Sequence, residues 1–343
     1  MTNQDKSLTK KPVLSIELKP SRRSLSLAGR GLTALSLPAD LSGLYFKKAE
    51  SYYRGDFVEQ SYEQAFYWYK KAADLRNAEA QRRLGFMCNN ALGVEKSYEQ
   101  AVDWFKKAAD QGDAKAQFNL GKSYNSGLGV DQSYEQANEW FKKAAEQGLA
   151  EAQSSLGNSY FHGLGVEVSY EQAVDWYKKA ADQGNFRAQY ALGRSYSFGL
   201  CVNQSYEDAI SWYLKSAVQG YVKAQFNLGY SYFYGEGVER SYEQAVDWFK
   251  KAADQGDAKA QFNLGHSYYY GHGVEQSYEQ ANEWYKKAAD QGNARAQCNL
   301  GDAYYYGEGL EVDQNKAIEF YKVSAAQHNK SAISRLKELG ITI

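Results

Sequence analysis

The chain has 343 residues, with 40 basic and 41 acidic side chains and a formal net charge of −1. This balance argues against a dedicated nucleic-acid binder and against an electrostatic membrane clamp, because both need an excess of basic residues. The lack of any run of about 18 apolar residues argues against a membrane span, and three cysteines without CxxC spacing argue against a disulfide framework.

Residues 1–43 differ in composition from the rest of the chain. The first forty residues carry seven basic and three acidic side chains and are rich in Ser and Leu. We expect a flexible leader, and a targeting or docking segment stays open as the alternative. Charged residues interrupt the apolar core that a Sec signal peptide needs. We therefore expect cytoplasmic localisation, or secretion without a Sec signal.

From residue 44 onward the sequence repeats with a period of 36 residues. The pentapeptide SYEQA recurs, first at Ser61 and next at Ser97, with the variants SYEDA at Ser205 and DQNKA at Asp313. An aromatic residue follows each of these eight copies in a constant register. In seven copies this residue is tryptophan, and Phe320 takes the eighth place. The tryptophans, which we expect to be structural, are Trp68, Trp104, Trp140, Trp176, Trp212, Trp248 and Trp284. A fixed period of this length indicates a repeat architecture.

Each unit predicts two short helices. One begins with Ser-Tyr-Glu-Gln, a capping box in which the Ser side chain accepts an orphan amide and the Gln reaches back, and it ends at a Gln-Gly pair such as Gly112. The other begins at a polar N-cap such as Asp113, carries A-Q-x-x-L-G-x-x-Y and ends in a G-x-G-V loop. Short helices are marginal alone, so we expect stacking to stabilise them and the tryptophans to be the buried anchors. The repeated LG glycine indicates close approach of the tryptophan-bearing helix.

These motifs resemble the Sel-one-like repeat (SLR) family, relatives of the tetratricopeptide repeats. The resemblance covers roughly residues 44–340. It implies an all-α fold, an α/α superhelical solenoid of eight 36-residue helix-hairpin repeats over residues 44–343. Residues 44–55 and 331–340 are the expected terminal capping helices. The resemblance also implies a scaffold or adaptor in signalling and protein assembly, and in bacteria an occasional secreted effector.

Variation among the copies points to a binding surface. In the A-Q-x-x-L-G helix the near-constant residues share one face, and the variable residues lie opposite. Position 86 and its equivalents differ in every full copy, which a packed core does not tolerate. Because the equivalent helix of the related tetratricopeptide superhelix lines a concave groove, we expect this stripe to bind a protein partner there. The predicted partner-binding residues are Lys122, Arg194, Tyr230, Phe233, Tyr234, His266, Tyr269, Tyr270, Asp302, Tyr305 and Tyr306.

The stripe becomes aromatic toward the C-terminus, where pairs such as Tyr269-Tyr270 recur. Tyrosine-rich surfaces are enriched at binding hot spots. One groove edge is mainly basic, although Glu79 and Glu151 interrupt it. A partner segment with apolar anchors and acidic residues would fit such a groove. Two alternatives stay open: the stripe is solvated surface without a role, or part of each pair packs against the next repeat.

Motifs of catalysis are missing from the sequence. None of the four histidines belongs to HExxH, there is no G-x-S-x-G elbow or P-loop, and the G-x-G-V loops follow helices rather than strands. We therefore expect no enzyme activity, no cofactor and no metal, and a monomer that does not bind nucleic acid. The alternatives are an aromatic-lined carbohydrate-binding solenoid and a secreted bacterial effector that acts on host proteins.

Overall fold

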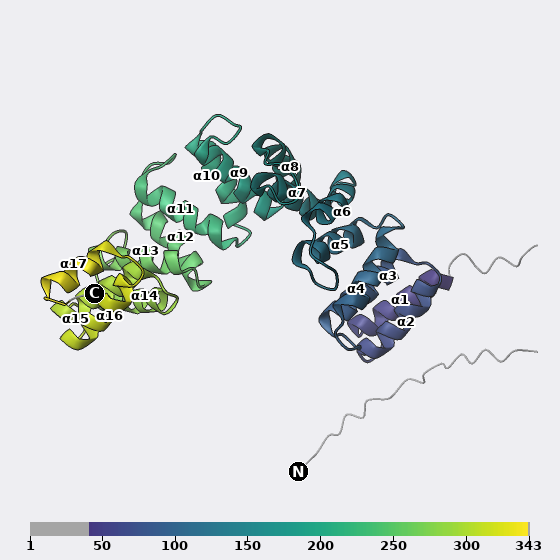
Figure 1. The fold of residues 1–343 in the computed structure, drawn as a ribbon, viewed down its shortest axis with the longest axis horizontal. Coiled ribbons are helices and arrows are strands. Elements are labelled where there is room, and N and C mark those ends of the chain that lie inside the picture. The colour runs from purple at the N-terminus through teal and green to yellow at the C-terminus, as the bar shows by residue number, and fades with distance from the viewer. Residues whose placement is uncertain (1–40, 342–343) are drawn as a thin grey trace, which may run out of the picture. The chain divides into compact units, whose positions relative to one another are not determined.

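The computed structural model describes residues 41–341, which form seventeen α-helices and no β-strand (Figure 1). The leader predicted for residues 1–43 lies almost wholly outside the described residues, and the first helix begins at Leu41 rather than at residue 44. In chain order the helices are α1 (Leu41–Arg54), α2 (Tyr62–Asp74), α3 (Ala78–Asn90), α4 (Tyr98–Ala109), α5 (Ala114–Ser126), α6 (Tyr134–Glu146), α7 (Ala150–His162), α8 (Tyr170–Asp182), α9 (Phe186–Phe198), α10 (Tyr206–Ala217), α11 (Val222–Tyr234), α12 (Tyr242–Asp254), α13 (Ala258–Tyr270), α14 (Tyr278–Asp290), α15 (Ala294–Tyr306), α16 (Gln314–Ala325) and α17 (Lys330–Glu338).

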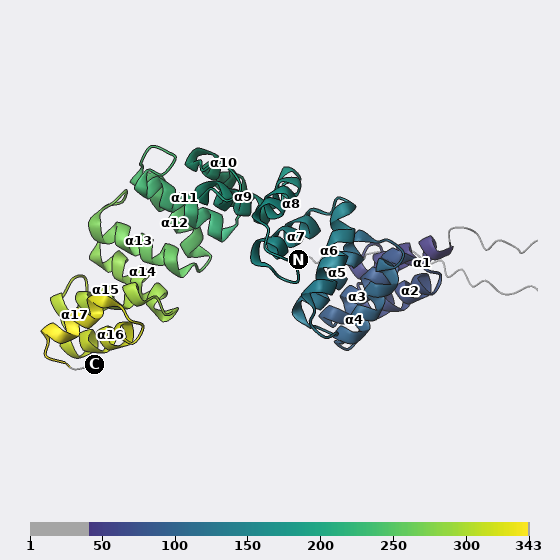
Figure 2. The ribbon, with the colours of Figure 1, turned by 45° about the horizontal axis from the view of Figure 1, so that its top comes forward.

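The helices pack in the order in which they occur along the chain. Each odd-numbered helix from α1 to α15 pairs with the even-numbered helix that follows it, and α17 packs on α16. The resulting hairpins stack on their chain neighbours (Figures 1 and 2). The predicted α-solenoid of eight repeats of about 36 residues is confirmed. The helices expected near residues 44–55 and 331–340 are α1 and α17.

The capping box is present only in part. Ser97 Oγ accepts the N–H of Gln100 at 3.2 Å and donates to Glu99 Oε2 at 3.2 Å. The predicted return bond from the glutamine has no free target, because the Ser97 amide already donates to the Cys88 carbonyl at 3.0 Å. That bond joins the start of α4 to the end of α3. The serine therefore caps its own helix and anchors it to the preceding one.

The buried aromatic residue of each unit is the one after the tryptophan, or after Phe320 in the eighth unit. These residues are Tyr69, Phe105, Phe141, Tyr177, Tyr213, Phe249, Tyr285 and Tyr321. The tryptophans are only partly buried, so the expectation that they are the buried anchors is wrong. Trp104, for example, contacts the core of the preceding hairpin, and the Lys107 ammonium lies 4.1 Å from its ring centre. A rotation of about 100° per residue explains the difference, because it turns the two neighbours toward different surroundings.

The repeated glycine is required by close helix packing, as predicted. A Cβ added to Gly121 would lie 2.7 Å from ring carbons of Phe141 and 3.1 Å from the Ala137 carbonyl oxygen. Both are closer than van der Waals contact permits. The glycine therefore lets α5 approach α6, and the close neighbour is the buried aromatic residue rather than the tryptophan.

Buried glutamines form a ladder that the sequence analysis did not anticipate. Gln117 on α5 donates to the Ala109 carbonyl at the end of α4, at 3.2 Å, and accepts from Gln147 after α6, at 2.8 Å. The same glutamine-to-glutamine bond recurs in seven successive steps, from Gln81 to Gln327. Each step satisfies a buried carbonyl and joins three consecutive helices.

Candidate functional site

The variable positions lie together on the odd-numbered helices. Among the equivalents of position 86, the exposed ones are Phe86, Lys122, Asn158 and Tyr230, and the half-buried ones are Arg194, His266 and Asp302. We call this side of α3 to α17 the variable face. Several cavities are lined mainly by residues of this face. The variable stripe is therefore accessible, but it is not uniformly exposed.

Part of the variation has an internal cause. Asn158 Oδ1 accepts the hydroxyl of Tyr177, the buried aromatic residue nineteen positions later, at 2.7 Å. A buried hydroxyl needs such a partner. Where the buried ring is a phenylalanine, no acceptor is required, and all three variable residues are exposed. These residues are Phe86, Lys122 and Tyr230. Variation among copies alone therefore does not identify a partner-binding residue.

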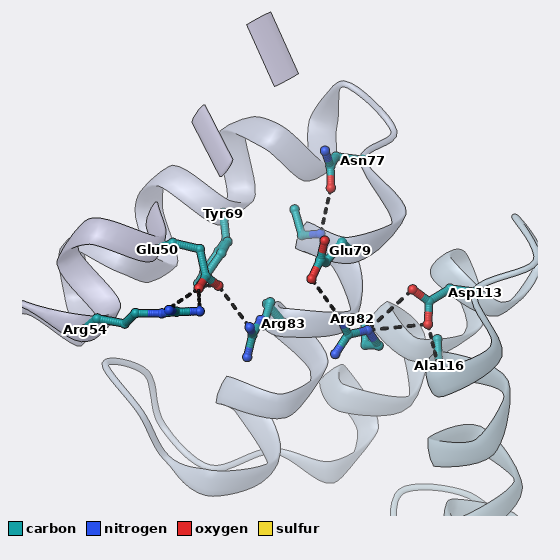
Figure 3. A network of polar contacts seen from close by, with 10 residues as sticks. Glu50, Arg54, Tyr69, Asn77, Glu79, Arg82, Arg83, Asp113 and Ala116 are labelled. Carbon is teal, nitrogen blue, oxygen red and sulfur yellow. Dashed lines mark hydrogen bonds and ion pairs between the residues drawn. The ribbon is translucent and has the colours of Figure 1, made fainter. Parts of the chain in front are cut away.

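The first unit shows the same arrangement with charged groups. Glu50 on α1 occupies the equivalent of position 86, accepts the hydroxyl of Tyr69 and pairs with Arg83 at 3.1 Å (Figure 3). Burial raises the pKa of Tyr69, and the Glu50 carboxylate raises it further. The hydroxyl therefore stays protonated and donates at all moderate pH values.

Asp302 has an equivalent internal role in the last full unit. Its Oδ1 accepts the hydroxyl of Tyr321 at 2.7 Å and pairs with Arg335 Nε at 3.0 Å. Arg335 also pairs with Glu338 at 3.4 Å. Asp302, which was predicted to bind a partner, thus connects α15, α16 and the terminal helix α17. Its charge is already balanced within the array.

Each aromatic pair has one member that packs inside the array and one member that is exposed. The Tyr269 hydroxyl donates to Glu308 Oε2 at 2.7 Å, and its ring packs against Tyr278 with centroids 5.1 Å apart. Tyr270, the next residue, is 55% exposed. The other first members, Phe233 and Tyr305, also pack against hairpin cores. The exposed second members are Tyr234, Tyr270 and Tyr306. The alternative that part of each pair packs inside the array is therefore confirmed.

One cavity of the variable face lies at its C-terminal end, and we call it the C-terminal cavity. Its volume is about 540 Å³, and its walls come from α11, α13, α15 and α17. The predicted binding residues that line it are Phe233, Tyr234, His266, Tyr270 and Asp302. Sequence reasoning missed Asn263 and Asn299, although their spacing of 36 residues was available as a signal. It also missed the contribution of α17, which was expected only to cap the array.

His266 is the titratable group of interest in this cavity. Burial lowers the pKa of its imidazole, and the nearby His272 and Arg295 lower it further. The ring is therefore neutral at pH 7 and contacts Tyr270, with centroids 4.5 Å apart. A neutral imidazole that packs against an aromatic ring fits a recognition surface better than an anion site.

The remaining predicted residues lie elsewhere on the same face. Arg194 lines a cavity of about 320 Å³, and Tyr230 lines one of about 420 Å³. Tyr305 and Tyr306 line a small cavity beside α17. Lys122 is exposed on α5, with its ammonium 5.9 Å from the Phe118 ring centre. The structure thus brings five predicted residues into one cavity and distributes the others along the array.

Within residues 41–341, no group of three or more His, Cys, Asp and Glu side chains is placed to hold a metal ion. No helix in the same range combines the length and apolar character needed to cross a membrane.

Comparison with known proteins places these observations in a family context. The Sel1 repeat model matches eight segments, residues 45–77, 78–113, 114–149, 150–185, 186–221, 222–257, 258–293 and 294–329. A crystal structure of c5321 from uropathogenic Escherichia coli, described as a protective antigen with an SLR fold, is 37% identical with a TM-score of 0.79. The similarity covers 87% of this chain but only 64% of c5321.

Two further solved structures are similar. A Sel1 repeat protein from Oxalobacter formigenes is 31% identical, with a TM-score of 0.66 and 87% of both chains covered. The signal-transduction ATPase PH0952 from Pyrococcus horikoshii, with its tetratricopeptide repeat sensor, is 16% identical at a TM-score of 0.50, over 86% of this chain and 48% of PH0952. The latter similarity shows a shared fold alone. Comparison with curated protein sequences gave no match.

Proposed function

Because this chain belongs to the Sel1 repeat family, we propose that it is a non-catalytic scaffold that holds a protein partner on the C-terminal part of the variable face. Sel1 repeat proteins are generally non-catalytic scaffolds, and solenoids of this kind commonly mediate protein–protein interaction. We take the scaffold to act as a monomer.

The observation that carries the proposal is the row of exposed tyrosines beside this cavity. Tyr234, Tyr270 and Tyr306 are 56%, 55% and 52% exposed, on the consecutive odd helices α11, α13 and α15. Burying the exposed part of one ring, on the order of 100 Å², stabilises a complex by about 2.5 kcal/mol. Large exposed apolar groups gathered in adjacent units are typical of an interaction surface.

These rings are also held in place before binding. Each packs edge-on against the preceding aromatic residue, and the Tyr269–Tyr270 centroids are 4.7 Å apart at 68°. The corresponding values for Tyr305–Tyr306 are 4.9 Å and 83°. A pre-ordered ring loses little conformational entropy when a partner covers it. The packed members of the pairs therefore support the exposed members.

The test compares two triple variants. Tyr234→Ala/Tyr270→Ala/Tyr306→Ala removes the exposed rings and leaves the packed members of each pair in place. The matched control changes similarly exposed apolar side chains on even-numbered helices: Tyr67→Ala, Leu214→Ala and Val323→Ala, which are 50%, 42% and 52% exposed. Affinity capture from cell extract should recover the same partners with the wild type and the control, and lose them with the tyrosine variant. A folded tyrosine variant that keeps those partners would contradict the proposal.

A competition arm separates a protein partner from a carbohydrate ligand. Excess soluble oligosaccharide should leave the captured protein bound, because a protein interface of several anchors does not depend on a sugar-binding platform. Release by oligosaccharide would favour the carbohydrate-binding alternative over the protein scaffold.

A further inference from the structure

The cavity of about 320 Å³ that is lined mainly by α7, α9 and α11, with Tyr177 from α8, has an unbalanced charge. Its basic lining residues are Arg187, Arg194 and Lys223. Its aromatic lining residues are Phe161, Tyr177, Tyr190 and Tyr221. The lining includes neither aspartate nor glutamate. We call it the basic cavity; its three main helices are neighbours in the array (Figure 2).

The three basic side chains have no acidic partner within residues 41–341. The ion pairs in that range belong to other arginines and to Lys316. Glu151 occupies the same helical register on α7 as Arg187 does on α9, yet it does not line the cavity. In the C-terminal cavity, by contrast, Arg335 is paired with two carboxylates. The positive charge of the basic cavity therefore remains available to an external anion.

The surroundings of Arg194 prepare its guanidinium for an anion. Arg194 is half-buried, and its guanidinium carbon lies 5.7 Å from the ring centre of Phe161 and 5.8 Å from that of Phe198. Burial raises the pKa of Tyr190 to about 12, although the charge of Arg194 opposes that rise. The phenol therefore stays protonated and can donate a hydrogen bond. A guanidinium packed beside two aromatic rings is suited to two-pronged recognition of a carboxylate.

The other two basic residues add to the field at the entrance. Arg187 is the second residue of α9, and Lys223 is the second residue of α11. Both are exposed. The N-terminus of a helix carries a partial positive charge, so these two helix starts reinforce the attraction of an anion toward Arg194.

We propose that the basic cavity is a second binding site on the variable face and that it receives an acidic side chain, Asp or Glu, of a peptide segment of the partner. This inference rests on the proposed scaffold function. The aromatic walls fit the apolar stem of such a side chain, and the basic groups fit its carboxylate. Three charges in one cavity match a single acidic residue or a short acidic pair rather than a long polyanion.

The two cavities share α11, which sets the spacing of the partner's anchors. Lys223 lines the basic cavity, and Tyr234, eleven residues later on the same helix, lines the C-terminal cavity. Eleven residues of α-helix span about 16 Å. An extended peptide covers that distance in about five residues. The partner segment is therefore expected to carry an acidic residue about five positions from an aromatic or aliphatic anchor.

A random peptide display library selected on the full chain tests this inference. The test variant is Arg187→Gln/Lys223→Gln. The matched control is Lys115→Gln/Lys259→Gln, which removes the same charge at the same helical register on α5 and α13, away from the basic cavity. Wild type and control should both enrich Asp or Glu at the expected spacing from an apolar anchor, and the test variant should lose that enrichment.

Binding of one synthesised peptide then isolates the central arginine. Arg194→Met, which keeps an apolar stem, should weaken the acidic peptide roughly tenfold or more and leave its Glu→Gln analogue unaffected. Weaker binding at high salt should accompany the wild-type interaction. Equal affinity of the acidic and amide peptides for the wild type would overturn the inference.

The remaining outcomes separate this inference from the proposed function. Selected peptides that lack acidic residues but still depend on Tyr234, Tyr270 and Tyr306 would overturn the basic-cavity proposal and leave the scaffold proposal standing. Failure to select any peptide would contradict both. Binding of inorganic phosphate to the basic cavity without acidic enrichment in peptides would show a free-anion site and overturn the peptide proposal.

Discussion

Two adjacent aromatic residues, Trp176 and Tyr177, offer a quantitative test of the packing. Tyr177 is 2% exposed and donates its hydroxyl to Asn158 at 2.7 Å. Truncating a large core aromatic residue costs about 3–5 kcal/mol, and the lost hydrogen bond adds about 1 kcal/mol. We therefore expect Tyr177→Ala to destabilise the array by about 4–6 kcal/mol.

Trp176 is larger but only partly buried. It contacts the core of the preceding hairpin, and the Lys179 ammonium lies 4.1 Å from its ring centre. Burial of roughly half of a 200 Å² side chain contributes about 2.5 kcal/mol, and the cation–π contact contributes about 0.5–1 kcal/mol. Trp176→Ala is therefore expected to cost about 3 kcal/mol, which is less than the tyrosine substitution despite the larger side chain.

Urea unfolding followed by far-UV circular dichroism measures both changes. Because neighbouring repeats unfold cooperatively, the comparison uses midpoints of transitions that have similar slopes. Tyr177→Phe serves as the control, since it removes only the hydroxyl and should cost about 1 kcal/mol. A Trp176→Ala midpoint at or below that of Tyr177→Ala would refute the assignment of the buried anchor.

Three further predictions follow from the packing contacts and from burial. Gly157→Ala should lower the thermal midpoint of unfolding, because the added Cβ would lie 2.7 Å from ring carbons of Tyr177 and overpacking costs about 1–3 kcal/mol. A raised midpoint would show that the higher helix propensity of alanine dominates instead. Gln153→Met should destabilise the array by about 1–3 kcal/mol, because it removes the donor to the buried Ala145 carbonyl and the acceptor of the Gln183 amide. In a double-mutant cycle with Gln183→Ala the two costs should not add, and full additivity would argue against the ladder. Burial lowers the pKa of His266, so the unfolded chain binds more protons than the folded chain below about pH 6.5, and stability falls as the pH drops from 7 to 5. His266→Gln should make that fall in stability shallower. An unchanged profile of stability against pH would count against a buried neutral imidazole.

Much of the fold was predictable because its determinants are local and repeated. Helix starts follow from capping residues such as Ser97 and Asp113, whose oxygen atoms accept amides three residues later. The LG glycine, as at Gly121, signals close helix approach without knowledge of the contacting residue. The binding hypothesis was partly predictable for the same reason, since exposed tyrosines such as Tyr270 stand out by their register in the repeat.

The sequence by itself determined the period, the helices and the face that differs from copy to copy, because capping, glycine geometry and helical periodicity act within one unit. Only the tertiary structure decided that Tyr177 rather than Trp176 is buried, that Tyr269 packs while Tyr270 faces solvent, and that Asn158 serves an internal hydroxyl. These outcomes depend on which side chains neighbouring helices present to one another. Burial and hydrogen bonding between residues far apart in the chain are properties of the packed array, and they cannot be inferred from the sequence of a single repeat.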